Sequence, residues 1–207
     1  MTDAPEPADT PRLRLQIIIA STRPGRRGLP IGQWIYSRAL AHGAFDVDLA
    51  DLAEINLPFF DEPGHPRLRQ YVHQHTKDWS ARVEAADAFV MVTPEYNFAM
   101  NAPLKNALDF LHQEWQYKPV GFVSYGGVSA GTRAVQMLKQ VVTTLKMTPL
   151  PEAVAIPFFA QFFDAEGRLN PNDTMESAAT AMLGELARFA AALRPLRAPA
   201  AAPVAAR

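Results

Sequence analysis

The stretch 88-AFVMVTPEYNFAM-100 passes from an apolar run directly into a polar and aromatic loop. Residues 88–92 are apolar and end at turn-forming residues, which predicts a short buried strand. Proline and asparagine suffice for the turn that follows. The glutamate, the tyrosine and the phenylalanine of the loop are not needed for its geometry. We therefore expect this loop to carry a function as well as a change in chain direction.

Apolar runs like this one recur along the chain and alternate with helical patterns. Further strands are predicted at 13–20, 45–52, 119–124 and 148–156. Helices are predicted at 31–42, 68–86, 131–146 and 174–193, with another opened by Pro103. This alternation predicts an α/β fold with a parallel sheet covered by helices on both faces. For five strands we expect the three-layer, flavodoxin-like order 2-1-3-4-5.

The composition is that of one globular domain, but the two terminal segments are less hydrophobic in pattern than the rest of the chain. Of the 207 residues, 48% are hydrophobic and 20% are charged, which suits a chain with a real core. Residues 1–11 and 194–207 are rich in proline and alanine and have little to bury, so we expect both segments to be disordered. The folded domain is then 12–193. Asp173, followed by Glu176, predicts a capping box at the start of its last helix.

Charge and cysteine content exclude several classes of protein. The formal net charge is −1, so nothing attracts the chain generally to nucleic acid or to an anionic membrane. The chain has no cysteine, which excludes disulfides, thiolate nucleophiles and cysteine-ligated clusters. No apolar run approaches the roughly 20 residues of a membrane span, and the N-terminus lacks the pattern of a signal peptide. We therefore expect a cytoplasmic protein.

Three polar loops should meet at one edge of the sheet, because ligands of such folds bind at the carboxyl ends of the strands. The first loop is 21-STRPGRRG-28, with two hydroxyls, three arginines and the start of a helix behind it. Free amides, a positive dipole end and arginine forks make a phosphate site. The loop has neither a dinucleotide fingerprint nor a Walker A pattern. Taken alone, a solvated basic turn is an equally good interpretation.

The other two loops suit a flat polar ring. In the second, Pro94 rigidifies the turn, Asn97 and nearby amides offer hydrogen bonds, and Tyr96 or Phe98 offers an apolar wall. Packing in the core or at a subunit interface is the alternative for these aromatic residues. In the third, 124-SYGGVSAG-131, two glycines let the backbone approach a ligand, although a strand–helix turn also uses glycine. A phosphate at one end and a planar polar ring at the other have the shape of FMN.

The three loops resemble those of the NAD(P)H-dependent FMN reductases, a flavodoxin-like group that includes soluble quinone, chromate and azo-compound reductases. The motifs are 21-STRPGRRG-28, 93-TPEYNFAMNAPLKNALDFL-111 and 114-EWQYKPVGFVSYGGVSAG-131, and the resemblance covers residues 13–192. Ala130-Gly131 replaces a second glycine pair often seen in the family. The resemblance implies FMN as cofactor, with these residues around it: Ser21, Arg23, Arg26, Gly28, Leu29, Pro30, Ile31, Pro94, Glu95, Tyr96, Asn97, Ser124, Tyr125, Gly126 and Gly127.

The resemblance also implies a mechanism and an assembly. No catalytic side chain is expected, since the flavin carries the redox chemistry. NADPH or NADH would deliver hydride, leave, and be replaced by free flavin, a quinone or a similar small acceptor, in ping-pong order. A homodimer or homotetramer is implied. Phe59, Phe60 and Phe98 are candidates for the substrate pocket, with packing as the alternative, and the segment 156-IPFFAQFF-163 leaves the same choice.

Some alternatives remain open at this point. An FMN-binding electron carrier or redox-sensing protein would show the same three loops, although the near-neutral charge and the arginine-rich loop favour an enzyme. A homologue without cofactor is a third alternative, against which the intact set of loops argues. Glu95 is expected to contribute only its backbone or to pair with an arginine of a neighbouring subunit. His73 and His75, two apart, should point to different sides of a helix, so no metal site is expected.

Overall fold

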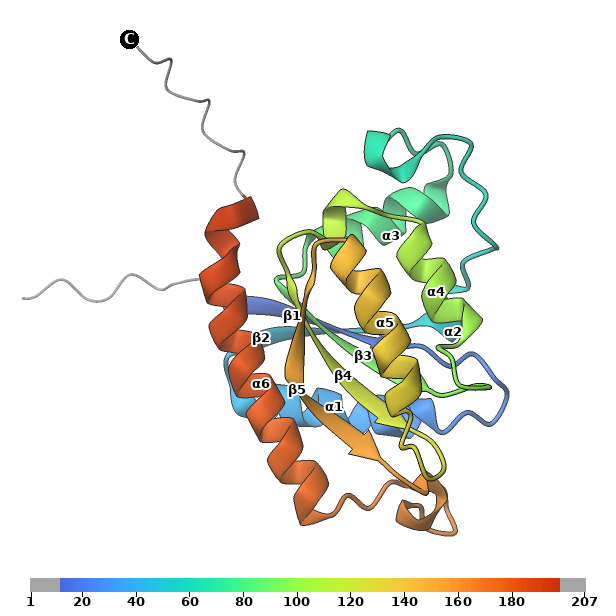
Figure 1. The fold of residues 1–207 in the computed structure, drawn as a ribbon, viewed down its shortest axis with the longest axis vertical. Helices are drawn as coiled ribbons and strands as arrows, with labels where there is room; N and C mark the ends of the chain where they lie inside the picture. Colours follow the sequence, from blue (N-terminus) through green and yellow to red (C-terminus); the bar gives the residue numbers. More distant parts are fainter. Residues whose placement is uncertain (1–11, 198–207) are drawn as a thin grey trace, which may run out of the picture.

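The computed structural model describes residues 12–197 and shows a five-stranded parallel sheet between two layers of helices (Figure 1). The strand order β2-β1-β3-β4-β5 confirms the predicted flavodoxin-like arrangement. The strands are β1 (Leu13–Ile19), β2 (Phe45–Asp51), β3 (Ala88–Pro94), β4 (Pro119–Tyr125) and β5 (Thr148–Ile156). The edge strand β5 accommodates its two prolines, as edge strands do.

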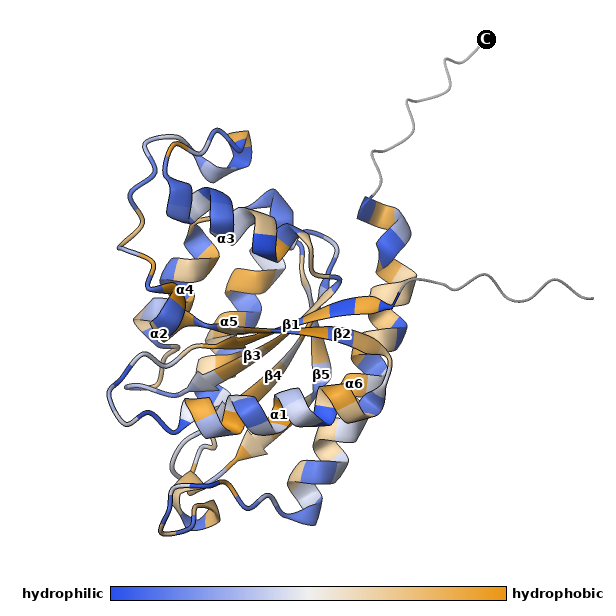
Figure 2. Ribbon diagram, turned by 180° about the vertical axis from the view of Figure 1, so that it is seen from behind, coloured by the Kyte–Doolittle hydropathy of each residue, from blue (hydrophilic) through white to orange (hydrophobic). Residues whose placement is uncertain are grey.

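The helices divide between the two faces of the sheet (Figures 1 and 2). On one face lie α1 and α6, and on the other lie α3, α4 and α5. Their bounds are α1 (Gly28–His42), α2 (Leu52–Ile55), α3 (Gln74–Glu84), α4 (Ala102–Asp109), α5 (Thr132–Thr144) and α6 (Asp173–Leu193). Four 3-10 turns complete the described chain: η1 (Pro66–Leu68), η2 (Gln113–Trp115), η3 (Phe159–Phe162) and η4 (Arg194–Arg197).

The sheet separates two hydrophobic cores. Every residue of β3 and β4 is buried, which explains their near-continuous apolar sequence. On the α1 and α6 side, Ile31, Ile35 and Leu186 pack against the strands. On the other side, Trp79 and Trp115 meet edge to face at a centroid distance of 6.0 Å. Each such side chain contributes about 1.5–3 kcal/mol when fully buried, so the middle of the sheet anchors the fold.

Helix α3 begins later than its sequence pattern predicts. The pattern covers residues 68–86, but the helix starts at Gln74. Arg69 adopts a left-handed conformation with φ of 52° and ends η1. The Glu62 carboxylate then accepts the backbone N–H groups of Val72 and His73 at 2.9 and 3.0 Å, which fixes an extended segment in front of α3. The prediction was wrong here because the carboxylate of another segment holds Val72 and His73 in front of the helix.

The N-cap of α6 and the segment that follows this helix also differ from expectation. Its N-cap is Asn172, whose side chain accepts the N–H of Met175 at 2.9 Å, so the predicted capping role of Asp173 was one residue off. After α6, η4 brings Arg197 to 2.8 Å from the Asp87 carboxylate. The folded part therefore extends past residue 193 into the segment predicted to be disordered. The expectations for 1–11 and 198–207 concern residues outside the described part.

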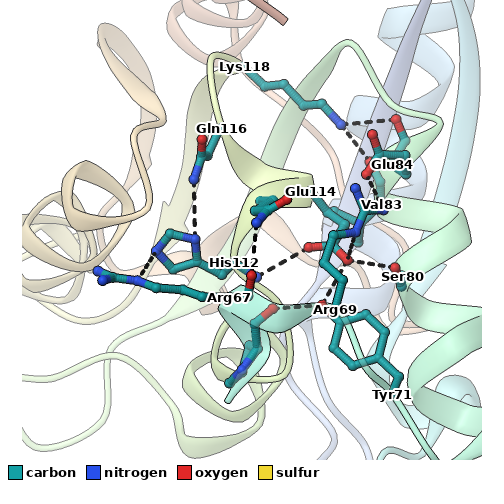
Figure 3. A network of polar contacts seen from close by, with 12 residues as sticks. Arg67, Arg69, Tyr71, Ser80, Val83, Glu84, His112, Glu114, Gln116 and Lys118 are labelled. Carbon is teal, nitrogen blue, oxygen red and sulfur yellow. Dashed lines mark hydrogen bonds and ion pairs between the residues drawn. The ribbon is translucent and has the colours of Figure 1, made fainter. Parts of the chain in front are cut away.

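A buried polar network closes the side of the fold where α3 ends (Figure 3). The Glu114 carboxylate is fully buried and accepts hydrogen bonds from Ser80 Oγ at 2.7 Å and Tyr71 Oη at 2.8 Å. Lys118 Nζ donates to the Val83 and Glu84 carbonyls at the end of α3 (Figure 3). Burial lowers the pKa of Lys118 to about 8. The charged groups of this network therefore bind α3 to η2 and to the segment before β4.

Candidate active site at the carboxyl edge of the sheet

The three loops predicted from the sequence meet around one cavity of about 480 Å³. They follow β1, β3 and β4, which are neighbours in the sheet. Residues of η3 close the cavity on a further side. Its lining is Ser21, Arg23, Pro24, Gly25, Arg26, Arg27, Pro94, Glu95, Tyr96, Tyr125, Gly126, Gly127, Phe159 and Ala160.

The loop after β1 leaves the start of α1 open to an anion. The N-cap residue Arg27 makes no side-chain capping bond, and the first turn holds no acidic residue. The N–H groups of that turn and the positive end of the helix dipole therefore face the loop without a carboxylate to satisfy them. Gly28 allows this turn to lie against the cavity wall, because a Cβ built there would stand 2.7 Å from Tyr125 Oη.

The three arginines of this loop have different partners. Arg26 forms an ion pair with Asp51, a carboxylate at the end of β2 that is 4% exposed. Arg23 lies 5.9 Å from the centroid of the Tyr96 ring, and Arg27 lies 4.8 Å from that of Phe163. Within residues 12–197 neither Arg23 nor Arg27 has a carboxylate within ion-pair distance. These two are the cations available to a ligand, whereas Arg26 shapes the loop.

The loop after β3 makes a tight reversal beside the cavity. Tyr96 and Ala99 exchange backbone hydrogen bonds of 3.0 and 2.9 Å. Between them Asn97 and Phe98 both have positive φ, 50° and 69°, as a two-residue hairpin turn requires. Asn101 Nδ2 donates to the Ala20 carbonyl at 2.6 Å and ties the loop to the end of β1. Nothing in the local sequence pattern marks Asn101 for this role.

Glu95 joins the second loop to the third. Its side chain is 6% exposed and accepts hydrogen bonds from Ser129 Oγ at 2.9 Å, Arg133 N at 3.2 Å and Arg133 Nε at 2.6 Å. The arginine partner therefore comes from the same chain, and the side chain as well as the backbone has a role. The expectation that Glu95 contributes only its backbone was wrong, because its side-chain contact spans 38 residues and depends on the fold.

The loop after β4 supplies a wall of backbone and one aromatic side chain. Tyr125 is 4% exposed and meets Phe159 edge to face at 5.4 Å. Burial raises the pKa of Tyr125, so its hydroxyl stays protonated at physiological pH. Gly127 lines the cavity with open space where a side chain would project. The backbone can thus approach a flat ligand directly.

Comparison with known proteins identifies the chain at this point. The sequence profile of the NADPH-dependent FMN reductases matches residues 13–161. The chain belongs to this family. It is 40% identical over 145 residues to an NAD(P)H-dependent FMN reductase of Schizosaccharomyces pombe, covering 69% of this chain and 72% of the relative. It is 36% identical over 136 residues to an NADPH:quinone oxidoreductase of Arabidopsis thaliana, covering 63% and 66%.

A solved structure shares the fold of this FMN reductase. FerB, a flavoenzyme NAD(P)H:(acceptor) oxidoreductase from Paracoccus denitrificans, superposes with a TM-score of 0.65 at 20% identity, covering 88% of this chain and 98% of FerB. Membership in the family makes the protein an oxidoreductase with FMN as its flavin cofactor and NAD(P)H as its reductant. The open helix start, the two available arginines and the open face of Gly127 fit a phosphate and a flat ring.

The cavity of this FMN reductase contains only part of the predicted set. Nine predicted residues line it: Ser21, Arg23, Arg26, Pro94, Glu95, Tyr96, Tyr125, Gly126 and Gly127. Ile31 instead packs in the core, and Ser124 is 1% exposed inside β4. Leu29 and Pro30 lie in the first turn of α1, and Asn97 lies at the tip of the tight turn. Sequence reasoning missed Arg27 as a lining residue, although it stands in the same loop as Arg23.

The substrate-pocket candidates lie outside this cavity. Phe59 is 87% exposed and borders a second hollow of about 520 Å³, together with Thr22 and Asn106. Asn106 holds that loop by accepting the Phe60 N–H at 2.9 Å and donating to the Pro58 carbonyl at 2.7 Å. Phe98 projects from the tight turn and is 66% exposed. Of the segment 156–163, Phe159 and Ala160 do reach the main cavity.

Two further expectations concern metal and membrane. Across residues 12–197 no group of three or more His, Cys, Asp or Glu side chains is arranged to hold a metal ion. His73 and His75 nevertheless do not diverge as expected, because His73 precedes α3, and their rings stack at 5.1 Å beside Asp61. In the same part of the chain, the helices are too short or too polar to cross a membrane.

Proposed function

We propose that this FMN reductase transfers two electrons from NAD(P)H through bound FMN to free flavin, a quinone or a similar small acceptor, in ping-pong order. For a quinone the balance is NAD(P)H plus one proton plus quinone, giving NAD(P)+ and the hydroquinone. The observation that carries the proposal is the 480 Å³ cavity, whose lining combines two available arginines with backbone glycines and aromatic side chains.

The residues have distinct roles in holding the cofactor. Ser21, Arg23, Arg27 and the open N–H groups of the first turn of α1 would bind the phosphate. Arg26, held by Asp51, keeps the loop in shape. Pro94 and Tyr96 on one side, with Gly126 and Gly127 on the other, would contact the ring. When bound, FMN supplies the hydride and electron transfer chemistry.

The chain's own polar groups support that chemistry without acting as acids or bases. The Tyr125 hydroxyl remains a donor, since burial keeps it protonated. Ser21 Oγ lies 3.2 Å from Tyr96 Oη and links the first loop to the second. Backbone N–H groups beside the ring would stabilise negative charge that develops on it. These groups therefore bind and orient the reactants.

The proposal includes a cytoplasmic homodimer or homotetramer. Large apolar side chains in the segments that follow β2, β4 and β5 face solvent, which is unusual unless another surface covers them. They are Phe59 at 87% exposed, Val128 at 76% and Phe158 at 59%. A second copy covering them would also shield the site. The absence of cysteine suits a reducing compartment.

Initial-rate kinetics test the order of reaction. With FMN-loaded protein, NADPH is varied at several fixed concentrations of a quinone, and the series is repeated with NADH. Ping-pong order predicts parallel lines in a double-reciprocal plot, because reductant and acceptor occupy the same place in turn. Intersecting lines would show that both bind together and would contradict the proposed order. Sedimentation of the same sample tests the assembly, and a single monomeric species would contradict that part.

A further inference from the structure

Phe98 is exposed to solvent, and its backbone adopts a conformation that is unfavourable for a non-glycine residue. Its φ is 69°, in the left-handed region that costs a non-glycine residue roughly 1–2 kcal/mol. Its ring is nevertheless 66% exposed, so burial does not offset that cost. The backbone pair between Tyr96 and Ala99 holds the turn that carries it. The ring is held outward at the rim of the site.

Arg133, in the first turn of α5, holds the ring in place. Its guanidinium carbon lies 3.7 Å from the centroid of the Phe98 ring. Its Nε is bound to the Glu95 carboxylate at 2.6 Å, which fixes the plane of the guanidinium. Within residues 12–197 its two terminal nitrogens make no hydrogen bond; its hydrogen bonds to Glu95 come from N and Nε. The side chain is 41% exposed, so these donors face solvent.

In the ion pair of Glu95 and Arg133, the positive charge is the more exposed of the two. Glu95 is 6% exposed and lies inside, whereas the Arg133 guanidinium lies outside. A ligand at the rim therefore meets a cation before it meets the carboxylate. Arg23 and Arg27, each near an aromatic ring, add positive charge around the same cavity. A flat cation beside an exposed aromatic ring suits a planar ligand that bears an anionic group.

We infer that Phe98 and Arg133, fixed by Glu95, form a platform that selects planar aromatic acceptors carrying a sulfonate or phosphate group. The aromatic part of the acceptor stacks on the platform, and its anionic group takes the terminal N–H donors of Arg133. Glu95 is a positioning residue, since it acts through Arg133. The role in turnover rests on the proposed function, but binding of such a compound to the platform is measurable without turnover.

The experiment is a calorimetric titration of the full chain, with and without FMN and without NAD(P)H. The ligands are anthraquinone-2-sulfonate and its neutral counterpart 2-(hydroxymethyl)anthraquinone. Arg133→Met should weaken sulfonate binding about tenfold or more, since it removes charge-assisted hydrogen bonds, and should change neutral binding less than about twofold. The preference of the wild type for the sulfonate should fall as salt rises. Lys139→Met, on the same helix, removes an equal charge and should change neither.

A second variant keeps the test sharp if Arg133→Met disturbs the loops by leaving Glu95 buried without its partner. Glu95→Gln in the Arg133→Met background removes that charge and should show the same selective loss. In turnover, Arg133→Met should raise KM for anthraquinone-2-sulfonate more than it raises KM for the neutral quinone. Equal weakening of both quinones, or no loss of sulfonate binding in either variant, overturns the platform. Failure of the proposed function has a different signature, namely bound FMN that NAD(P)H does not bleach.

Discussion

Replacing Gly28 with alanine tests how closely the first loop packs against the wall of the site. The new Cβ would lie 2.7 Å from Tyr125 Oη and 3.4 Å from Ser21 Cβ. Tyr125 is 4% exposed, and its rigid ring packs on Phe159, so the hydroxyl has little room to retreat. Overpacking costs about 1–3 kcal/mol, against a gain of at most about 1 kcal/mol from the helix propensity of alanine.

Urea denaturation of four proteins measures this contact: wild type, Gly28→Ala, Tyr125→Phe and the double variant. We expect Gly28→Ala to lower the free energy of unfolding by about 1 kcal/mol or more, and to weaken FMN binding. Without the hydroxyl, the nearest Tyr125 atom to the new methyl is Cζ at 3.5 Å, an ordinary contact. The cost should therefore nearly vanish in the Tyr125→Phe background.

A matched control is Gly184→Ala in α6, where nothing lies within 4 Å of the added Cβ. It should raise stability by up to about 1 kcal/mol. An equal loss from Gly28→Ala in both backgrounds would refute the reasoning, because the clash would then not involve the hydroxyl. No loss in the wild-type background would refute it as well.

Three other predictions follow from the charges. Arg23→Met should weaken binding of FMN about tenfold but leave riboflavin, which lacks the phosphate, nearly unchanged; equal loss of both in parallel titrations would place Arg23 away from the phosphate. Arg26→Met should instead lower the free energy of unfolding by about 3 kcal/mol, because Asp51 at 4% exposure loses its ion pair, and a wild-type urea midpoint would contradict the assignment. Lys118 has a folded pKa of about 8 against its usual 10.5, so the folded state releases that proton first. The free energy of unfolding of the wild type should therefore rise relative to that of Lys118→Met between pH 8 and 10.5, by on the order of 3 kcal/mol. A difference between the two proteins that stays constant across that pH range would contradict the burial of the Lys118 charge.

The strands and their order could be predicted because the pattern is local and strong. β3 and β4 are almost continuously apolar and buried throughout, and alternation with helices leaves few topologies for five strands. The start of α3 could not, since the carboxylate of Glu62 that fixes it stands in a different segment. Helical spacing alone extends the pattern through Arg69, where the backbone is left-handed.

The meeting of the three loops was predictable, and the contacts of their side chains were not. Loops after β1, β3 and β4 must meet wherever those strands are neighbours. The three arginines of the first loop are indistinguishable in sequence, and only the fold shows that Arg26 is paired with Asp51. The link between Glu95 and Arg133 likewise depends on contacts between distant segments. Contacts between side chains of two different loops can be seen only in the folded structure, because the loops are far apart in the sequence.

The most direct test of the central claim is an anaerobic absorbance titration of the protein reconstituted with FMN, adding NADPH and, in a second sample, NADH. The account predicts that the bound flavin band bleaches rapidly with about one equivalent of at least one of the two nucleotides, and that a quinone then restores it. Tight FMN binding without bleaching would contradict the reductase and indicate a carrier or sensor. Failure to bind FMN would contradict the assignment of the 480 Å³ cavity as the flavin site.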